Sequence, residues 1–128
     1  VKLNVLTEAV KGKRVVMIDD SIVRGTTSDR IVSMLKSAGA KEVHVRISSP
    51  PFLHECYFGT DIPSKDQLIA NGRTVEEIRK IIGADSLGYL EFDRLSEMVN
   101  GLPICTGCFN GEYPMESPKE DIRGEYEK

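Results

Sequence analysis

The fold of this chain is decided by one stretch, RVVMIDDSIVRGTTS at residues 14–28. Its apolar first half predicts a buried strand of a parallel sheet. Two adjacent carboxylates, Asp19 and Asp20, follow, and then a loop that is rich in hydroxyls and backbone donors. Thr27 or Ser28 is expected to cap the helix that comes next. In open α/β sheets the ligand usually binds at the carboxyl end of a strand, where a short loop leads directly into a helix. The charged residues here stand at such a position.

The residue types in this loop suit a sugar phosphate. Gly25 lets the backbone approach a phosphate closely, and the N-terminus of the next helix adds N–H groups and a favourable dipole. The carboxylates of Asp19 and Asp20 repel a phosphate, so their expected partners are sugar hydroxyls or a hydrated Mg²⁺. The pair of acids alone is as easily explained by an ordinary strand end, and the hydroxyl-rich loop alone by an ordinary helix cap. Both halves in this order favour a ribose 5-phosphate site.

The motif resembles the phosphoribosyl pyrophosphate (PRPP) signature of type I phosphoribosyltransferases. Its version IDDSIVRGTTS, at residues 18–28, is similar to that of the glutamine PRPP amidotransferases. In purine-salvage relatives an acid usually stands at the position of Val23 and contacts the incoming base, whereas an apolar residue suits ammonia as the acceptor. The resemblance implies amidophosphoribosyltransferase activity: glutamine-derived ammonia replaces the pyrophosphate of PRPP and gives 5-phosphoribosylamine, the first step of purine nucleotide synthesis.

The same resemblance implies roles for individual residues. Asp19 and Asp20 are the expected catalytic residues, because they would hold the ribose hydroxyls directly and through Mg²⁺. The residues from Ser21 to Thr27 would cradle the 5-phosphate. The implied PRPP contacts are Asp19, Asp20, Ser21, Ile22, Val23, Arg24, Gly25, Thr26 and Thr27.

Three cysteines form a second constellation. Cys105 and Cys108 make a Cys-x-x-Cys element, and Cys56 lies upstream in an aromatic segment. Two thiolates at this spacing can bind a metal or a cluster, but a redox dithiol, a disulfide or coincidence also explains them. Zinc needs a fourth ligand, and His54 is available for that role. A [4Fe–4S] cluster needs four thiolates, and the chain has three.

The resemblance extends to these cysteines. The cluster-containing class of PRPP amidotransferases has a similar Cys-Tyr/Phe-x-Gly segment and a C-terminal Cys-x-x-Cys-Phe-x-Gly-x-Tyr-Pro, which this chain matches at residues 105–114. It implies that Cys56, Cys105 and Cys108 are three ligands of a [4Fe–4S] cluster with a structural role. The fourth cysteine is expected in upstream sequence.

Composition sets the class of protein. The chain has 128 residues, of which 40% are hydrophobic and 29% charged, as in one globular domain or part of one. A net charge of −3 and a pI near 5.4 argue against a sequence-independent nucleic-acid binder. No apolar run reaches the roughly 18 residues of a membrane span. The first residue is not Met and no signal-peptide pattern is present, which favours a truncated, cytoplasmic protein.

The rest of the chain alternates strand and helix signals. Residues 43–47 and 87–90 predict strands, and Thr74 and Glu77 have the spacing of a capping box. The apolar face of the helix that this box begins is expected to consist of Val75, Ile78, Ile81 and Ile82. Ser49 and Pro50 are expected to form a wall of the site, because their strand ends at the same sheet edge as the two acids. His44 is expected to be a partly exposed strand residue rather than a catalytic one.

The predicted fold is α/β. Residues 1–115 are expected to form the C-terminal portion of a type I phosphoribosyltransferase domain, Rossmann-like with a parallel sheet. This portion ends in a mostly helical region that bears cysteines, and residues 116–128 are expected to be a polar tail. So few strands would leave apolar sheet surface uncovered, which favours a homo-oligomer.

The expected partners are PRPP, pyrophosphate, purine nucleotides and a glutaminase domain of the same parent chain, with no nucleic acid or membrane. The isolated chain is expected to be inactive. Two other functions remain open at this point: a non-catalytic regulatory module that senses PRPP, and a structural zinc domain. The zinc ligands would be His54, Cys56, Cys105 and Cys108.

Overall fold

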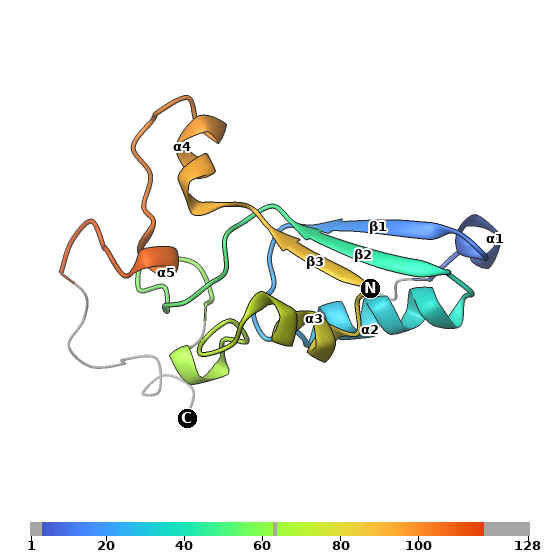
Figure 1. Ribbon diagram of the computed structural model, residues 1–128. Helices are drawn as coiled ribbons and strands as arrows, with labels where there is room; N and C mark the ends of the chain where they lie inside the picture. The colour runs from blue at the N-terminus through green and yellow to red at the C-terminus, as the bar shows by residue number, and fades with distance from the viewer. Residues whose placement is uncertain (1–3, 63, 117–128) are drawn as a thin grey trace.

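Three parallel strands form the sheet, in the order β1-β2-β3 (Figure 1). The computed structural model describes residues 4–62 and 64–116. Registers run from Arg14↔Glu42 to Asp19↔Ile47 between the first two strands and from His44↔Ser86 to Ile47↔Tyr89 between the last two. The carboxyl ends of all three strands therefore meet at one edge of the sheet, which confirms the predicted α/β class. The strands are β1 (Arg14–Asp19), β2 (Glu42–Ile47) and β3 (Ser86–Tyr89).

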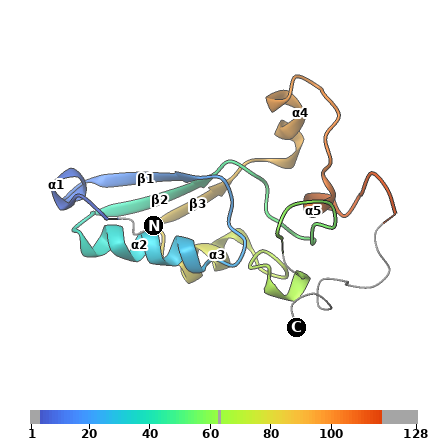
Figure 2. The same cartoon turned by 180° about the vertical axis from the view of Figure 1, so that it is seen from behind.

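Two helices, α2 (Thr26–Ser37) and α3 (Val75–Ile82), cover one face of this sheet in both views (Figures 1 and 2). The core lies between them and the sheet, because alternate residues of β2 point to the same side. Its buried members are Ile22, Val32, Val43, Val45, Ile47, Ile69, Ala70, Ile78, Ile82 and Ala84. None of the helices in the described ranges is long and apolar enough to cross a membrane.

The described residues leave the opposite face of the sheet uncovered, and this corrects the expectation that β1 is a buried strand. Val16 is 61% exposed and Ile18 is 76% exposed. Successive strand residues alternate between faces, so only Val15, Met17 and Asp19 turn toward the helices. Neither view shows a helix on the other side of β1 (Figures 1 and 2). The uncovered apolar surface itself was expected from the small number of strands.

The start of α3 follows the sequence pattern. Thr74 Oγ1 accepts a hydrogen bond from Glu77 N–H at 3.2 Å, and Glu77 Oε2 accepts one from Thr74 N–H at 3.0 Å, which completes the capping box. The predicted apolar face is only half correct, since Ile78 is buried with Ile82 whereas Val75 and Ile81 are exposed. A helix of eight residues touches the sheet along one narrow stripe, and positions four apart share it.

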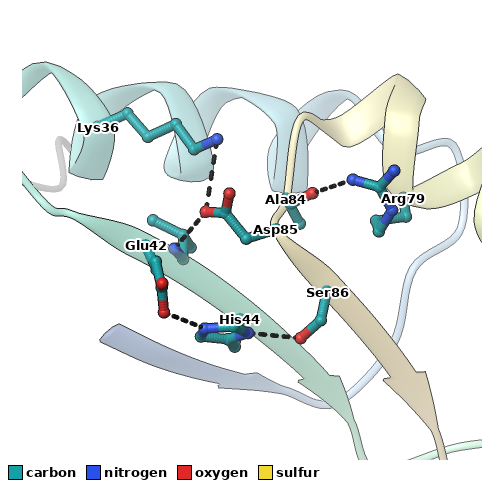
Figure 3. A network of polar contacts seen from close by, with 8 residues as sticks. Lys36, Glu42, His44, Arg79, Ala84, Asp85 and Ser86 are labelled. Atoms are coloured by element: carbon teal, nitrogen blue, oxygen red, sulfur yellow. Dashed lines mark hydrogen bonds and ion pairs between the residues drawn. The ribbon is translucent and has the colours of Figure 1, made fainter. Parts of the chain in front are cut away.

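Polar contacts around the turn before β3 join the helices to the sheet (Figure 3). Asp85 Oδ2 accepts a hydrogen bond from Val43 N–H at 2.7 Å and lies 3.6 Å from Lys36 Nζ on α2. Arg79 on α3 donates to the carbonyl of Ala84 at 2.8 Å. The N–H of Val43 and, to a smaller extent, the ammonium of Lys36 lower the pKa of Asp85. Asp85 is therefore charged at neutral pH and holds α2 and β2 together.

Between β3 and Glu116 the chain forms only short helices, although the sequence predicts this region to be mostly helical. They are η2 (Phe92–Arg94), α4 (Leu95–Met98) and α5 (Gly107–Asn110). Short helices need a packed apolar face to be stable, and Met98 on α4 is largely exposed. Two more short elements, α1 (Thr7–Val10) and η1 (Lys65–Gln67), lie earlier in the chain. The predicted polar tail, apart from Glu116, lies outside the described residues.

Candidate functional site

A cavity of about 470 Å³ lies where β1 ends and α2 begins. Each of the nine residues predicted to contact PRPP, from Asp19 to Thr27, lines it. Ser28 extends this continuous run, and Asp61 joins it from a distant segment. The structure thus gathers the whole predicted run around one space.

Gly25 shapes the turn into α2. Its φ is 88°, in the left-handed region that favours glycine, and it directly precedes the first residue of the helix. A Cβ at this position would lie 2.5 Å from Cδ1 of Ile69, so the backbone is packed closely against the core. The predicted cap by Thr27 or Ser28 is wrong, because α2 begins at Thr26 without a side-chain cap.

The absence of a cap has a chemical consequence. The N–H groups in the first turn of any helix lack intrahelical acceptors, and a side-chain cap would occupy one of them. Here the turn after Gly25 borders the cavity, and no side chain caps it. These N–H groups and the helix dipole together favour an anion at this end of the cavity.

The loop between strand and helix is anchored from behind. Ile22 is buried in the core, and the carbonyl of Val23 accepts a hydrogen bond from Ile69 N–H at 2.9 Å. Two of the predicted contacts, Ile22 and Gly25, can therefore offer a ligand mainly their backbone. One side of the loop is thus packed against the core, and the polar groups of the loop border the cavity.

The two adjacent acids form the other end of the cavity. Asp20 N–H donates to Asp19 Oδ1 at 2.8 Å, and Ser21 Oγ donates to Asp20 Oδ1 at 3.4 Å. Burial raises the pKa of Asp19, the charge of Asp20 adds to the rise, and the N–H of Asp20 opposes it. No ion pair within residues 4–62 and 64–116 involves either acid. A cation or a set of hydroxyl donors would relieve this concentration of negative charge.

The end of β2 supports this site from behind and does not line it. Ser48 N–H donates to the carbonyl of Asp19 at 3.0 Å, which steadies the strand end. Ser49 and Pro50, expected as a wall, are not among the cavity residues; Ser49 Oγ donates to the carbonyl of Pro50 at 3.0 Å. Asp61 was missed because it lies in an irregular segment with no motif. Only the folded chain brings it to the cavity.

His44 lies away from the cavity, on the uncovered face of the sheet. Its Nδ1 is 2.6 Å from Ser86 Oγ and its Nε2 is 3.0 Å from Glu42 Oε2 (Figure 3). Arg46 also donates to Ser86 Oγ, at 2.9 Å. Both ring nitrogens are thus engaged, Nδ1 with Ser86 on the neighbouring strand β3 and Nε2 with Glu42 on the same strand, β2. This agrees with the expectation of a partly exposed strand histidine.

The second constellation lies around an aromatic cluster that joins residues 52–58 to the segment with α5. The N–H groups of Leu53 and His54 both donate to the carbonyl of Cys108, at 2.9 and 3.1 Å. Phe52 stacks on Phe109 with ring centroids 5.3 Å apart. These contacts place the Cys56 segment beside the Cys-x-x-Cys element.

Tyr113 closes the aromatic cluster. Its hydroxyl donates to the carbonyl of Glu55 at 2.7 Å, and its ring centroid lies 5.2 Å from that of Tyr57 and 5.9 Å from that of Phe58. Gly107 allows the Tyr113 ring to pack against the backbone, because a Cβ there would overlap the ring. The glycine and the tyrosine of the matched motif therefore fit each other directly.

The thiols differ in their surroundings. Burial acts to raise the pKa of Cys56, but hydrogen bonds from the N–H groups of residues 58–60 and from the Thr60 hydroxyl lower it overall. Burial raises the pKa of Cys108 to about 11, and the charges of Cys56 and Cys105 add to the rise. Cys108 is therefore close enough to each of the other two thiols to be affected by its charge.

These thiols do not form a site for a single ion. No group of three His, Cys, Asp or Glu side chains in the described ranges is arranged to hold one metal. The zinc alternative, with His54 beside the three cysteines, thus finds no support in the geometry. The ligands of a four-iron cluster lie further apart than those of one ion, because each thiolate binds a different iron atom. The absence of a single-ion site in the described ranges is therefore compatible with a cluster.

Comparisons with known proteins bear on both constellations. No family model matches the chain. It is 54% identical over 121 residues to "Amidophosphoribosyltransferase, chloroplastic" of Glycine max, covering 93% of this chain and 21% of that protein. It is 53% identical over 124 residues to the amidophosphoribosyltransferase of Archaeoglobus fulgidus, covering 94% and 27%. The Methanocaldococcus jannaschii protein of the same name is 50% identical over 123 residues, covering 96% and 26%.

Solved structures agree with these relatives. The glutamine PRPP amidotransferase from B. subtilis, complexed with ADP and GMP, superposes with a TM-score of 0.83 at 49% identity, covering 91% of this chain and 27% of that one. A structure described as the allosteric regulatory enzyme of purine biosynthesis gives 0.83 at 48% identity, covering 91% and 26%. Over the roughly one quarter of its relatives' length that it spans, the chain belongs to the amidophosphoribosyltransferase family.

Proposed function

We propose that this chain supplies the PRPP-binding part of an enzyme that transfers glutamine-derived ammonia to carbon 1 of PRPP. The products are 5-phosphoribosylamine and pyrophosphate, in the first step of purine nucleotide synthesis. One observation carries the proposal: a single cavity is lined by the continuous run from Asp19 to Ser28, with carboxylates at one end and an uncapped helix N-terminus at the other. The amidophosphoribosyltransferase relatives support it.

The proposed roles follow from the charge distribution. Asp19 and Asp20 accept hydrogen bonds from the ribose hydroxyls, while Thr26, Thr27 and the first-turn N–H groups hold the 5-phosphate. Positive charge develops at carbon 1 as its bond to pyrophosphate breaks. Catalysis then consists mainly of positioning and of electrostatic stabilisation by groups that are already in place.

Mg²⁺ fits the acidic end of this cavity. It prefers oxygen ligands, and Asp19 and Asp20 are adjacent carboxylates without a described cationic partner. We propose that these two residues hold Mg²⁺ together with the substrate. When bound, the ion neutralises charge on the departing pyrophosphate.

A [4Fe–4S] cluster fits the cysteine constellation. We propose Cys56, Cys105 and Cys108 as three ligands and a cysteine outside this sequence as the fourth. The N–H groups around Cys56 favour its thiolate form, which is the form that binds iron. Such a cluster would join residues 52–62 to the segment with α5 and would have a structural role. Iron and sulfide in the purified protein would support it, whereas stoichiometric zinc would contradict it.

Other proposed properties extend beyond the chain itself. We propose that it corresponds to the C-terminal part of a phosphoribosyltransferase domain that works with a glutaminase domain. Purine nucleotides carry the same ribose 5-phosphate as PRPP, so we expect the same loop to bind them. The uncovered side of β1, with Val16 and Ile18, favours a homo-oligomer or coverage by another segment. We expect the protein in the cytoplasm.

Calorimetric titration of Mg-PRPP into the purified chain tests the proposal. Binding is expected, and Asp20→Asn should weaken it about tenfold or more because a charged hydrogen-bond acceptor is lost. Asp66→Asn is the matched control, since Asp66 on η1 is exposed and does not line the cavity. Equal affinities of Asp20→Asn and wild type would contradict the assignment. Binding without phosphoribosylamine formation by the intact protein that carries this sequence would favour a PRPP sensor instead.

A further inference from the structure

Among the described residues, Asp61 is the one that reaches the cavity from outside the strand–loop–helix run. Its carboxylate has no hydrogen bond or ion pair with any residue in the described ranges. A third carboxylate in a cavity that offers N–H groups to a phosphate cannot serve to bind that phosphate. Its natural partner is positive charge or a strong hydrogen-bond donor.

The backbone on both sides of Asp61 is held in place. Before it, the N–H groups of residues 58–60 point to the thiol of Cys56. After it, Ile62 is buried, and its N–H donates to the carbonyl of Thr60 at 2.8 Å. Asp61 therefore sits on a tight turn between two anchors, so its position at the cavity is a property of the fold.

The segment that follows Asp61 runs to the Val23 side of the loop. Ile69 N–H donates to the carbonyl of Val23 at 2.9 Å, and Cδ1 of Ile69 would lie only 2.5 Å from a Cβ added at Gly25. Carboxylates therefore reach the cavity from two separate parts of the chain. Asp19 and Asp20 lie at the end of β1, and Asp61 lies in the irregular segment before η1.

We propose that Asp61 is the acceptor-side carboxylate, which stabilises the incoming amine in the ammonia transfer; this inference rests on the proposed function. In that step the nitrogen lone pair forms the bond to carbon 1, and the carbon–oxygen bond breaks with its electron pair leaving on pyrophosphate. The nitrogen becomes positively charged, and Asp61 accepts a hydrogen bond from one of its N–H groups. A carboxylate is a much weaker base than an amine, so the proton finally passes to water.

The experiment compares Asp61→Asn, Asp61→Glu and the control Asp66→Asn in the intact protein that carries this sequence. Two quantities are measured: the affinity for Mg-PRPP by calorimetry, and kcat/KM for added ammonium salt from phosphoribosylamine formation. Asp61→Asn is expected to lower kcat/KM for ammonia about tenfold without weakening Mg-PRPP binding, because the lost carboxylate repels the phosphate groups. Asp61→Glu should restore part of the loss, because it retains the charge, and Asp66→Asn should behave as wild type.

Three results would overturn the inference. An unchanged kcat/KM for ammonia in Asp61→Asn would show that the carboxylate does not act on the acceptor. A loss of Mg-PRPP affinity comparable to that of Asp20→Asn would place Asp61 on the PRPP side of the cavity. Wild-type protein that neither binds Mg-PRPP nor forms product would refute the proposed function, and this inference with it. The three results differ from one another, so the two proposals fail separately.

Discussion

The substitution Gly25→Ala tests how closely the phosphate loop is packed against the core. Gly25 has a φ of 88°, and a Cβ added there would lie 2.5 Å from Cδ1 of Ile69, which is only 5% exposed. The next nearest atom, Cγ1 of the same isoleucine, is 3.7 Å away. Alanine therefore faces two separate penalties, one from the left-handed backbone and one from a single methyl group.

The two penalties can be estimated separately. The left-handed conformation costs alanine about 1–2 kcal/mol relative to glycine. Overpacking against a buried side chain costs about 1–3 kcal/mol more. Gly25→Ala should thus lower the free energy of unfolding by about 2–5 kcal/mol. Gly12→Ala is the matched control, because Gly12 has a φ of 72° and nothing within 4 Å of the added Cβ. It should cost only the backbone term, about 1–2 kcal/mol.

The free energies of unfolding are measured by urea titration. The proteins compared are wild type, Gly25→Ala, Gly12→Ala, Ile69→Val and the double variant Gly25→Ala/Ile69→Val. The change at residue 69 removes the methyl group that the introduced alanine side chain would meet, so Gly25→Ala should cost only about 1–2 kcal/mol in that background. Mg-PRPP binding should fall in Gly25→Ala and not in Gly12→Ala. Equal destabilisation by Gly25→Ala and Gly12→Ala, or no relief from Ile69→Val, would refute the reasoning.

Three further predictions concern single side chains. Thr74→Ala removes one side of the capping box and should lower the free energy of unfolding by about 1 kcal/mol in urea titration, whereas Thr74→Ser should retain it. Tyr89→Phe should leave stability unchanged or raise it by up to about 1 kcal/mol, because the buried hydroxyl has no partner in the described part of the chain. Burial raises the pKa of Tyr89 from 10.0 to about 12, so wild-type stability should fall as pH rises through this interval, and Tyr89→Phe should abolish that fall. Asp19→Asn should stabilise the free chain at pH 7, because burial raises the pKa of Asp19 and disfavours its charge, yet it should weaken Mg-PRPP binding. Loss of stability in Asp19→Asn, measured by thermal unfolding, would contradict this sign.

Local signals in the sequence predicted the strand–loop–helix unit and the capping box correctly. The apolar run that becomes β1, the two acids after it and the helix that starts at Thr26 are adjacent in the chain, so their order alone places them together. Thr74 and Glu77 are three residues apart and meet in any helix that begins there. Such features depend on backbone geometry over a few residues, which the amino-acid order determines directly.

Contacts between distant segments were decided only by the tertiary structure. Asp61 lines the cavity next to the buried Ile62, although no local signal marks it. Gly25, rather than the expected threonine or serine, precedes α2, where its left-handed backbone packs closely against the distant Ile69. The exposed side of β1 likewise depends on which elements cover the sheet. None of these follows from local periodicity, because each depends on where another part of the chain, far away in sequence, comes to rest.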